Sequence, residues 1–154
     1  MSLLRAVRIE IETLIEIPVE VCFDLARDVD KHVESAAFSG ERLVAPGRLH
    51  GLLELGDLVA FEARHFGMRQ TFVARIVELE PPRRFVDEMV RGAFRWLRHE
   101  HEFHIHARGT LMRDIIVWRS RFGFIGRIAD ALFVKRHMEW FVRTKQQNLK
   151  RMSE

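Results

Sequence analysis

The C-terminal end of the chain is one long segment with a helical pattern. Phe124 to Met152 contains no proline and no glycine apart from Gly126. One helical face collects Met138, Phe141, Val142, Leu149 and Met152, with Lys145 inside the same arc. At 1.5 Å per residue such a helix spans on the order of 40 Å. It is long enough to cross a whole domain, so the remaining elements have to be arranged around it.

Upstream of this helix the sequence predicts two short helices within a series of strands. Arg5 to Ile17 alternates aliphatic and charged residues, which is typical of a half-buried strand. Pro18 ends that strand and suits the first residue of a helix. Helices are predicted over Val19–Arg27 and Asp30–Ala37. Later strands are predicted over Glu41–Ala45, Asp57–Phe66, Met68–Glu80, Phe85–Val90, Phe94–His106 and Thr110–Ser120, separated by glycine and proline turns.

Length and charge narrow the class of protein. The 154 residues fit a single domain, which we take to span residues 1–154. No apolar run approaches the roughly 20 residues that a membrane span needs, and Met1 to Ile11 reads as a strand, not as a signal peptide. The net charge of +3 is too small and too dispersed to indicate a nucleic-acid partner. A single cysteine, Cys22, excludes an intramolecular disulfide, fits a reducing cytoplasm and is expected in the core.

The aromatic composition points to an apolar interior. The chain has 12 Phe and 3 Trp but no Tyr, so its large side chains carry few hydroxyl groups. Such a set suits a large core or an apolar ligand better than a polar one.

The order of elements and several local motifs resemble the START/Bet v 1-like (SRPBCC) superfamily. The segment from Ile11 to Val21 resembles the family's first strand and its proline-started helix. Leu79 to Phe85, with its Pro-Pro pair, resembles the hairpin turn, and Gly109-Thr110 with Gly123-Phe124-Ile125-Gly126 resembles the last strand and helix entry. The resemblance covers nearly the whole chain. It implies an α+β helix-grip fold, in which a curved antiparallel sheet wraps around the C-terminal helix and encloses a cavity.

Strand parity predicts which side chains line that cavity. On Phe94–His106 the odd positions are the less charged, so Leu97, His99, His101, Phe103 and Ile105 are expected to face inward. The corresponding inner sets are Met112, Asp114, Ile116 and Trp118 on the last strand, and Phe61, Ala63 and His65 on Asp57–Phe66. Polar groups on these apolar faces are therefore His65, His99, His101 and Asp114.

Two interpretations of this polar group remain open. Two histidines at i and i+2, with a third histidine and a carboxylate, could hold zinc or iron. Hydrogen bonding among Asp114, the histidines and water is the favoured alternative, so no metal and no cofactor is predicted. His101 and Asp114 are also candidates for a general acid–base pair in a cyclase or dehydratase.

The sequence therefore predicts a protein that binds or carries an apolar or amphiphilic small molecule, such as a lipid, a quinone or a polyketide-like compound. The candidate ligand-binding residues are Phe61, His65, His99, His101, Phe103, Asp114, Ile116, Trp118 and Leu132. An aromatase/cyclase- or dehydratase-type enzyme is the alternative, and a protein-interaction module with a vestigial cavity is a further one. The first half of the long helix is apolar nearly all round, which suggests a homodimer contact through Phe133 and Trp140.

Overall fold

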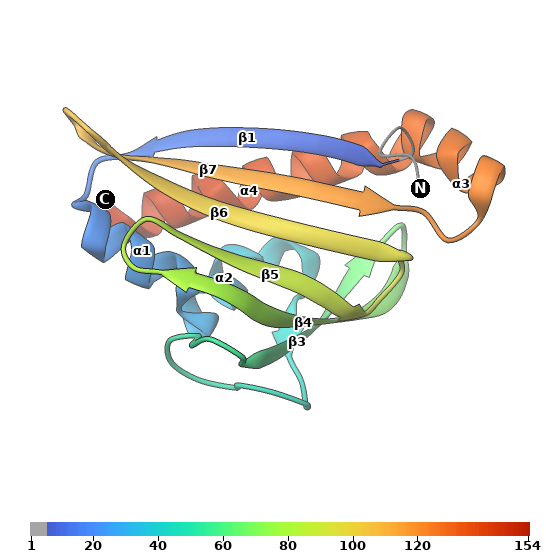
Figure 1. Ribbon diagram of the computed structural model, residues 1–154, viewed down its shortest axis with the longest axis horizontal. Coiled ribbons are helices and arrows are strands. Elements are labelled where there is room, and N and C mark those ends of the chain that lie inside the picture. The colour runs from blue at the N-terminus through green and yellow to red at the C-terminus, as the bar shows by residue number, and fades with distance from the viewer. Residues whose placement is uncertain (1–5) are drawn as a thin grey trace.

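The computed structural model describes residues 6–154, and its helices lie against one face of an antiparallel sheet (Figure 1). The predicted first strand includes Arg5, and the segment predicted to be a strand and not a signal peptide includes Met1–Arg5. Residues 1–5 lie outside the described residues. The strands are β1 (Val7–Ile15), β2 (Arg42–Leu43), β3 (Leu58–His65), β4 (Met68–Glu80), β5 (Arg84–Arg91), β6 (Trp96–His106) and β7 (Gly109–Arg119). The helical elements are α1 (Val19–Arg27), α2 (Val29–Ser35), η2 (Ala37–Ser39), α3 (Gly123–Ala129), η3 (Asp130–Val134) and α4 (Lys135–Ser153).

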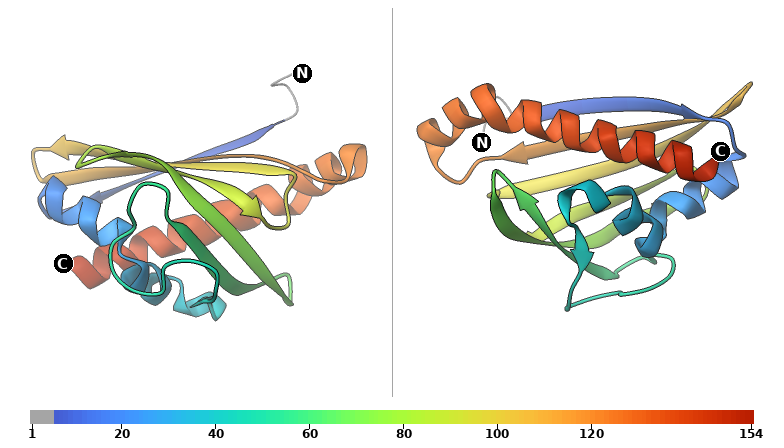
Figure 2. Two further views of the ribbon diagram at one scale, coloured as in Figure 1. Left: turned by 60° about the horizontal axis from the view of Figure 1, so that its bottom comes forward. Right: turned by 180° about the vertical axis from the view of Figure 1, so that it is seen from behind.

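The seven strands form one sheet in the order β1-β7-β6-β5-β4-β3-β2. Every neighbouring pair is antiparallel, and β3 to β7 follow one another as hairpins. The first strand instead pairs with the last, with Ile11 opposite Asp114. The sheet curves, and α4 runs along its inner face while α1 and α2 close the same side (Figure 2). This is the α+β helix-grip fold that the sequence predicted.

Alternation along β6 and β7 separates an inner from an outer face, as the parity argument expects. Met112, Asp114, Ile116 and Trp118 are all buried on β7. On β6, Leu97, His101 and Phe103 are buried, whereas Ile105 at the end of the strand is 83% exposed. Ile105 is the second-last residue of β6, close to the turn that joins β6 to β7. The tip of this hairpin projects past the helices (Figure 1).

The predicted C-terminal helix is one helical stretch with a π-helical segment inside it. The segment η3 begins at Asp130, whose carboxylate is buried and accepts hydrogen bonds from Nε1 of Trp118 (3.2 Å) and from the Ser120 hydroxyl. In an uninterrupted α-helix Val142 would be turned about 120° away from Asp130. A π turn accommodates one extra residue and brings the two side chains to about 20° of each other, so both can face the sheet.

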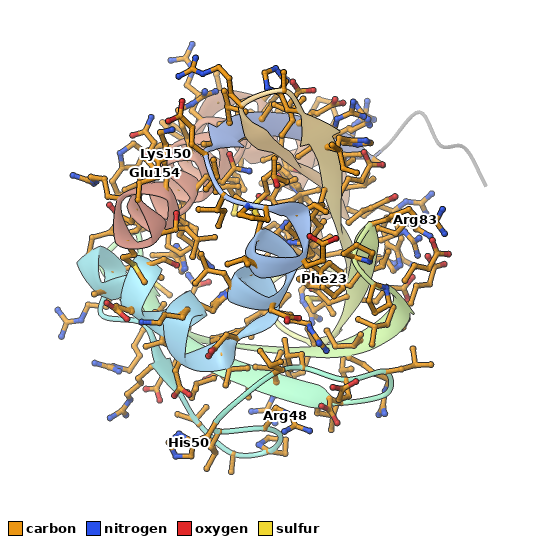
Figure 3. All side chains as sticks on the ribbon, turned by 90° about the vertical axis from the view of Figure 1, so that its left-hand side faces the viewer. Phe23, Arg48, His50, Arg83, Lys150 and Glu154 are labelled. Carbon is orange, nitrogen blue, oxygen red and sulfur yellow. The ribbon has the colours of Figure 1, made fainter. Side chains whose placement is uncertain are left out.

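Buried apolar side chains form two clusters between the sheet and the helices. Phe23 of α1 is fully buried and makes edge-on contacts with Phe85 and Phe103, with ring centroids 5.8 and 5.3 Å apart. Figure 3 shows Phe23 in the interior, whereas Arg83 lies at the periphery. Cys22 beside it is also buried, which confirms the prediction that it is a core residue, and burial raises the pKa of its thiol to about 12.

Side chains of α4 bond to the backbone of β1, the strand at one edge of the sheet. Nε2 of Gln146 donates to the carbonyl oxygen of Ile11 (3.1 Å), and Nζ of Lys150 donates to that of Leu14 (2.7 Å). Glu154 accepts from the backbone N–H of Glu16, just after the strand (2.9 Å). Positions 146, 150 and 154 are four residues apart, so one face of α4 and its C-cap follows the second half of β1.

The second helix was predicted over Asp30–Ala37, and both of its boundaries differ in the structure. The second helix begins at Val29 because the side chain of Asp28 accepts hydrogen bonds from the N–H groups of Asp30 and Lys31. It ends at Ser35, and the chain continues as η2. Within residues 6–154, no helix is both long enough and apolar enough to cross a bilayer.

Candidate functional site

A cavity of about 220 Å³ lies between the inner face of the sheet and the helices. Strands β3 to β7 supply one side of its lining, and α2, η3 and α4 supply the other. Most lining side chains are aliphatic or aromatic. The charged ones gather in two groups, which we name the sheet cluster (Asp87, His99, His101 and Asp114) and the helix cluster (His32, Glu41 and Lys145).

The register of three strands assembles the sheet cluster. His101 on β6 lies opposite Asp114 on β7, and His99 lies opposite Asp87 on β5. His101 bonds Asp114 through Nδ1 (2.8 Å) and Asp87 through Nε2 (2.9 Å). Nε2 of His99 lies 2.7 Å from the same oxygen of Asp114. The two imidazoles stack with centroids 3.7 Å apart, and Phe85 stacks on the other face of His101 at 4.2 Å.

These contacts fix the charges in the sheet cluster. Burial disfavours protonation of His101, but its hydrogen bonds to Asp114 and Asp87 outweigh burial and raise its pKa to about 9. Burial, followed by the charge of His101, lowers the pKa of His99. Burial alone would raise the pKa of Asp114, yet the two histidines hold it well below its ordinary value. The cluster at neutral pH is therefore an imidazolium between two carboxylates, with a neutral imidazole beside them.

The hydrogen bonds also assign the tautomers. His101 donates from both ring nitrogens because both face carboxylate oxygens. A neutral His99 that donates from Nε2 to Asp114 keeps its proton there, so its Nδ1 is an acceptor. Nδ1 of His99 makes no hydrogen bond to any described residue, and the side chain lines the cavity. The sheet cluster consequently offers a hydrogen-bond acceptor to a ligand.

A buried glutamine ties the sheet cluster to the long helix. Nε2 of Gln146 donates to Asp114, and its Oε1 accepts from the hydroxyl of Thr13 on β1 (2.6 Å). Gln146 is 2% exposed, so both ends of its amide are satisfied inside the protein. The position of Asp114 is thus held from β6 and from α4 at once.

The helix cluster joins α2, the segment before β2, and α4. Nζ of Lys145 is within hydrogen-bond distance of Nε2 of His32, and Oε1 of Glu41 lies 3.2 Å from that nitrogen and 4.0 Å from Nζ. Burial and then the charge of Lys145 lower the pKa of His32. Burial alone would raise the pKa of Glu41, but the charge of Lys145 opposes burial, and the pKa lies below its ordinary value. The cluster is an ion pair with a neutral imidazole between its partners.

His65 lies apart from the other predicted histidines. Its Nδ1 is 2.7 Å from Nε2 of His137 on α4, and its ring contacts Phe141. Burial lowers the pKa of both His65 and His137. Both rings line the cavity beside Phe66 of the β3–β4 turn.

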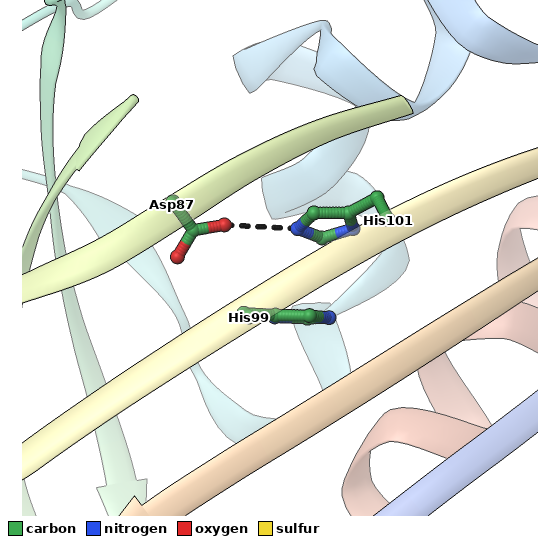
Figure 4. A group of neighbouring side chains, drawn as sticks. All are labelled: Asp87, His99 and His101. Carbon is green, nitrogen blue, oxygen red and sulfur yellow. Dashed lines mark hydrogen bonds and ion pairs between the residues drawn. The ribbon is translucent and has the colours of Figure 1, made fainter. Parts of the chain in front are cut away.

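One group in the described chain has the donor set of a metal site, namely Asp87, His99 and His101 (Figure 4). One donor atom from each lies within 4.8 Å of the others. His101 is held protonated by two carboxylates, and an imidazolium cannot coordinate a metal. Metal binding here would have to displace a proton and the Asp87–His101 hydrogen bond.

The structure places six of the nine candidate ligand-binding residues on the cavity wall: Phe61, His65, His99, His101, Asp114 and Ile116. Phe103 packs in the core beneath α1, and Trp118 is fully buried with its N–H bonded to Asp130. Leu132 is 55% exposed, because it lies two residues after the buried Asp130 and therefore on the opposite side of the helix. These three residues do not line the cavity.

Sequence reasoning missed several polar residues of the site. Asp87 shares strand parity with Phe85, so the inner face of its strand could have been read from the alternation. Lys145 falls within the apolar arc of the long helix, which signals a buried charge that needs a partner. For Glu41 and Gln146 the sequence carries no such signal, since their burial depends on how the elements pack.

Fold and cavity together define the class: this is a helix-grip protein with a mostly apolar internal cavity that carries two polar clusters, and the START/Bet v 1-like resemblance is confirmed for the fold. No family model matches the sequence, and no curated protein is detectably similar to it. Solved structures do match. TTHA0849 from Thermus thermophilus is 18% identical with a TM-score of 0.73, and the match covers 95% of this chain and 94% of that one.

Two further solved structures match, one of a plant protein and one of a protein from a biosynthetic pathway. Major latex-like protein 151 from Panax ginseng is 12% identical with a TM-score of 0.72, over 97% of this chain and 98% of that one. The di-domain ARO/CYC StfQ of the steffimycin biosynthetic pathway is 14% identical with a TM-score of 0.75. That match covers 96% of this chain but 51% of StfQ, so this chain spans about half of that protein. Similarity at these identities establishes the fold.

Proposed function

We propose that the protein binds an amphiphilic small molecule in the cavity, with the apolar body of the ligand against the aromatic and aliphatic walls and a polar group at the sheet cluster. The observation that carries this proposal is the combination of a mostly apolar cavity with the cluster of charged side chains on its sheet wall. A ligand group that donates a hydrogen bond would meet Nδ1 of His99. Lipids, quinone-derived compounds and polyketide-like molecules all fit this description.

The energetics favour an amphiphile over a purely apolar ligand. Leaving a buried acceptor without a partner costs on the order of 1–3 kcal/mol. A hydrocarbon that displaced water from His99 would incur that cost, whereas a hydroxyl or N–H donor would avoid it. Walls such as Phe61 and Ile116 then contribute affinity through buried area, at roughly 25 cal/mol per Å².

Native mass spectrometry of protein purified from its own host identifies the ligand, because an apolar cavity often retains it. We then expect His99→Phe to weaken binding of that ligand roughly tenfold, equivalent to about 1.4 kcal/mol. Asp114 keeps its bonds to His101 and Gln146 in this variant, so the fold should persist. Thr71→Val is the matched control, since Thr71 lines the cavity outside both clusters.

Unchanged affinity in His99→Phe would contradict the placement of the polar group at the sheet cluster. Metal analysis of the same preparations tests the alternative of a metal site. Stoichiometric zinc or iron that is lost in His99→Phe would show that His99 coordinates a metal and does not accept a hydrogen bond from the ligand.

An aromatase/cyclase- or dehydratase-type enzyme is the second candidate function. It is favoured by His101, which is held protonated on the cavity wall and could donate a proton to a leaving hydroxyl group that displaced the Asp87 carboxylate from Nε2. The ARO/CYC name of StfQ belongs to the same class of activity. His101→Gln separates the two candidates: an enzyme loses turnover of the recovered ligand, whereas a carrier shows no turnover before or after the change.

A further inference from the structure

Glu41 carries an unsatisfied buried atom. Its side chain is 5% exposed, and Oε1 is the one buried side-chain polar atom in residues 6–154 without a hydrogen-bond partner. Glu41 also lines the cavity. A buried carboxylate oxygen without a donor is expensive, and proteins keep few such atoms. This oxygen therefore calls for a donor that the chain itself does not supply.

The nearest candidate donor, His32, cannot fill this role. Its Nε2 lies 3.2 Å from Oε1 of Glu41, but the same nitrogen is within hydrogen-bond distance of the Lys145 ammonium group. An ammonium group only donates, so Nε2 of His32 must accept and carries no proton. The low pKa of His32 agrees with a neutral ring. Lys145 is 4.0 Å from Oε1, close enough to attract it but too far for a hydrogen bond.

The surroundings of Oε1 suit a hydroxyl group. A hydroxyl can donate to Glu41 and accept from Lys145, which a purely donating amine cannot do. Aromatic surfaces lie beside it: His32 stacks on Phe61 with centroids 4.4 Å apart, and Nζ of Lys145 lies 5.6 Å from the Phe141 ring. Such walls favour a flat ring as the bearer of the hydroxyl group.

We infer that the helix cluster is a second polar subsite, which binds a ring hydroxyl of the ligand through Glu41. This inference rests on the proposed function and narrows it. The ligand class becomes a hydroxylated ring compound with a polar group at each of two places, one at His99 and one at Glu41. Two consecutive residues of α4 contact the two clusters: Lys145 belongs to the helix cluster, and Gln146 bonds Asp114 of the sheet cluster.

Two bicyclic probes that differ by one hydrogen-bond donor test the subsite, 2-naphthol and 2-methoxynaphthalene. We expect the wild-type protein to bind 2-naphthol at least tenfold more tightly, because a hydrogen bond to a charged acceptor is stronger than a neutral one. Glu41→Gln keeps a weaker, neutral acceptor and should reduce that ratio. Glu41→Met removes the acceptor and should bring the ratio close to one. Glu34→Met, at a carboxylate on the outer side of α2, is the control.

Thermal melting of each variant shows that it is folded, and Glu41→Gln keeps the volume of the native side chain if Glu41→Met does not fold. A ratio that stays at the wild-type value in both Glu41 variants overturns the subsite. A ratio that falls only in His99→Phe places the hydroxyl group at the sheet cluster, which overturns the inference and leaves the proposed function standing. No binding of either probe to the wild-type protein contradicts both.

Discussion

His101 is a buried residue whose charge is set by its neighbours. Its imidazolium group lies between carboxylates of two strands, Asp87 on β5 and Asp114 on β7, with rings stacked on both faces. A neutral imidazole could donate to only one of these carboxylates, so the arrangement depends on the positive charge. The protonation state of one side chain thereby contributes to the stability of the fold.

The raised pKa of His101 predicts a specific pH dependence. Since the pKa rises from 6.5 to about 9 on folding, its stabilisation is fully present below about pH 6.5 and is lost as the pH rises through about 9. We expect a loss of up to about 3 kcal/mol between these limits. Asp87 and Asp114, whose pKa values are lowered, stay ionised throughout this window.

Urea unfolding at several pH values from 6 to 10 measures this effect. The difference in the free energy of unfolding between wild type and His101→Gln isolates it from buried histidines such as His65 and His99, whose pKa values are lowered and which act at lower pH. A difference that is constant with pH would show that His101 is neutral in the folded protein.

At the scale of elements, α4 closes the inner face of the sheet. It supplies Phe141, Val142, Gln146 and Leu149 to the interior. Without it, the buried faces of β1 and β7 and both polar clusters would be open to water. The fold therefore depends on an element that comes last in the chain.

Deletion of residues 123–154 tests this dependence. We expect insoluble or molten material and not a smaller folded domain, because the deletion exposes a large apolar surface. Gln146→Leu is a milder companion change: it keeps the helix but leaves Asp114 and Thr13 without their amide partner. A cooperative thermal transition in the truncated protein would contradict this account of the fold.

The sequence was sufficient to predict most helices and strands and to predict which side chains of the strands face inward. Alternation on β6 and β7 identified His99, His101 and Asp114 as inward-facing because side-chain direction repeats every two residues. The partners of these residues could not be predicted. Asp87 joins His101 through the β5–β6 register, and Gln146 reaches Asp114 through helix packing. The π segment also left no trace in the sequence, since it results from anchoring Asp130 to Trp118.

At the scale of the whole molecule, an apolar surface extends from α3 into α4. Exposed side chains there include Phe122, Phe124, Ile125, Ile128, Leu132 and Phe133. Trp140 is 54% exposed and packs edge-on against Phe38. Monomers rarely expose apolar patches of this kind unless another surface covers them. A homodimer through Phe133 and Trp140 therefore stays a prediction.

Light scattering coupled to gel filtration measures the mass in solution. We expect a dimer in the wild-type protein at high concentration, and a monomer after Phe133→Glu or Trp140→Glu, since a buried unpaired charge opposes association. Val21→Glu is the control, because Val21 is 53% exposed on α1. A wild-type protein that remains monomeric at all concentrations would contradict the homodimer.

The contacts of α4 with β1 restrict how chains can associate. An edge strand ordinarily offers its free N–H and C=O groups to a strand from another molecule, which is how sheets grow into fibrils. Here Gln146, Lys150 and Glu154 already bond backbone groups along the second half of that edge, and the opposite edge is the two-residue β2. Strand addition along this half of β1 would first have to displace the long helix. Polymerisation through the sheet is therefore opposed by the same helix that closes the cavity.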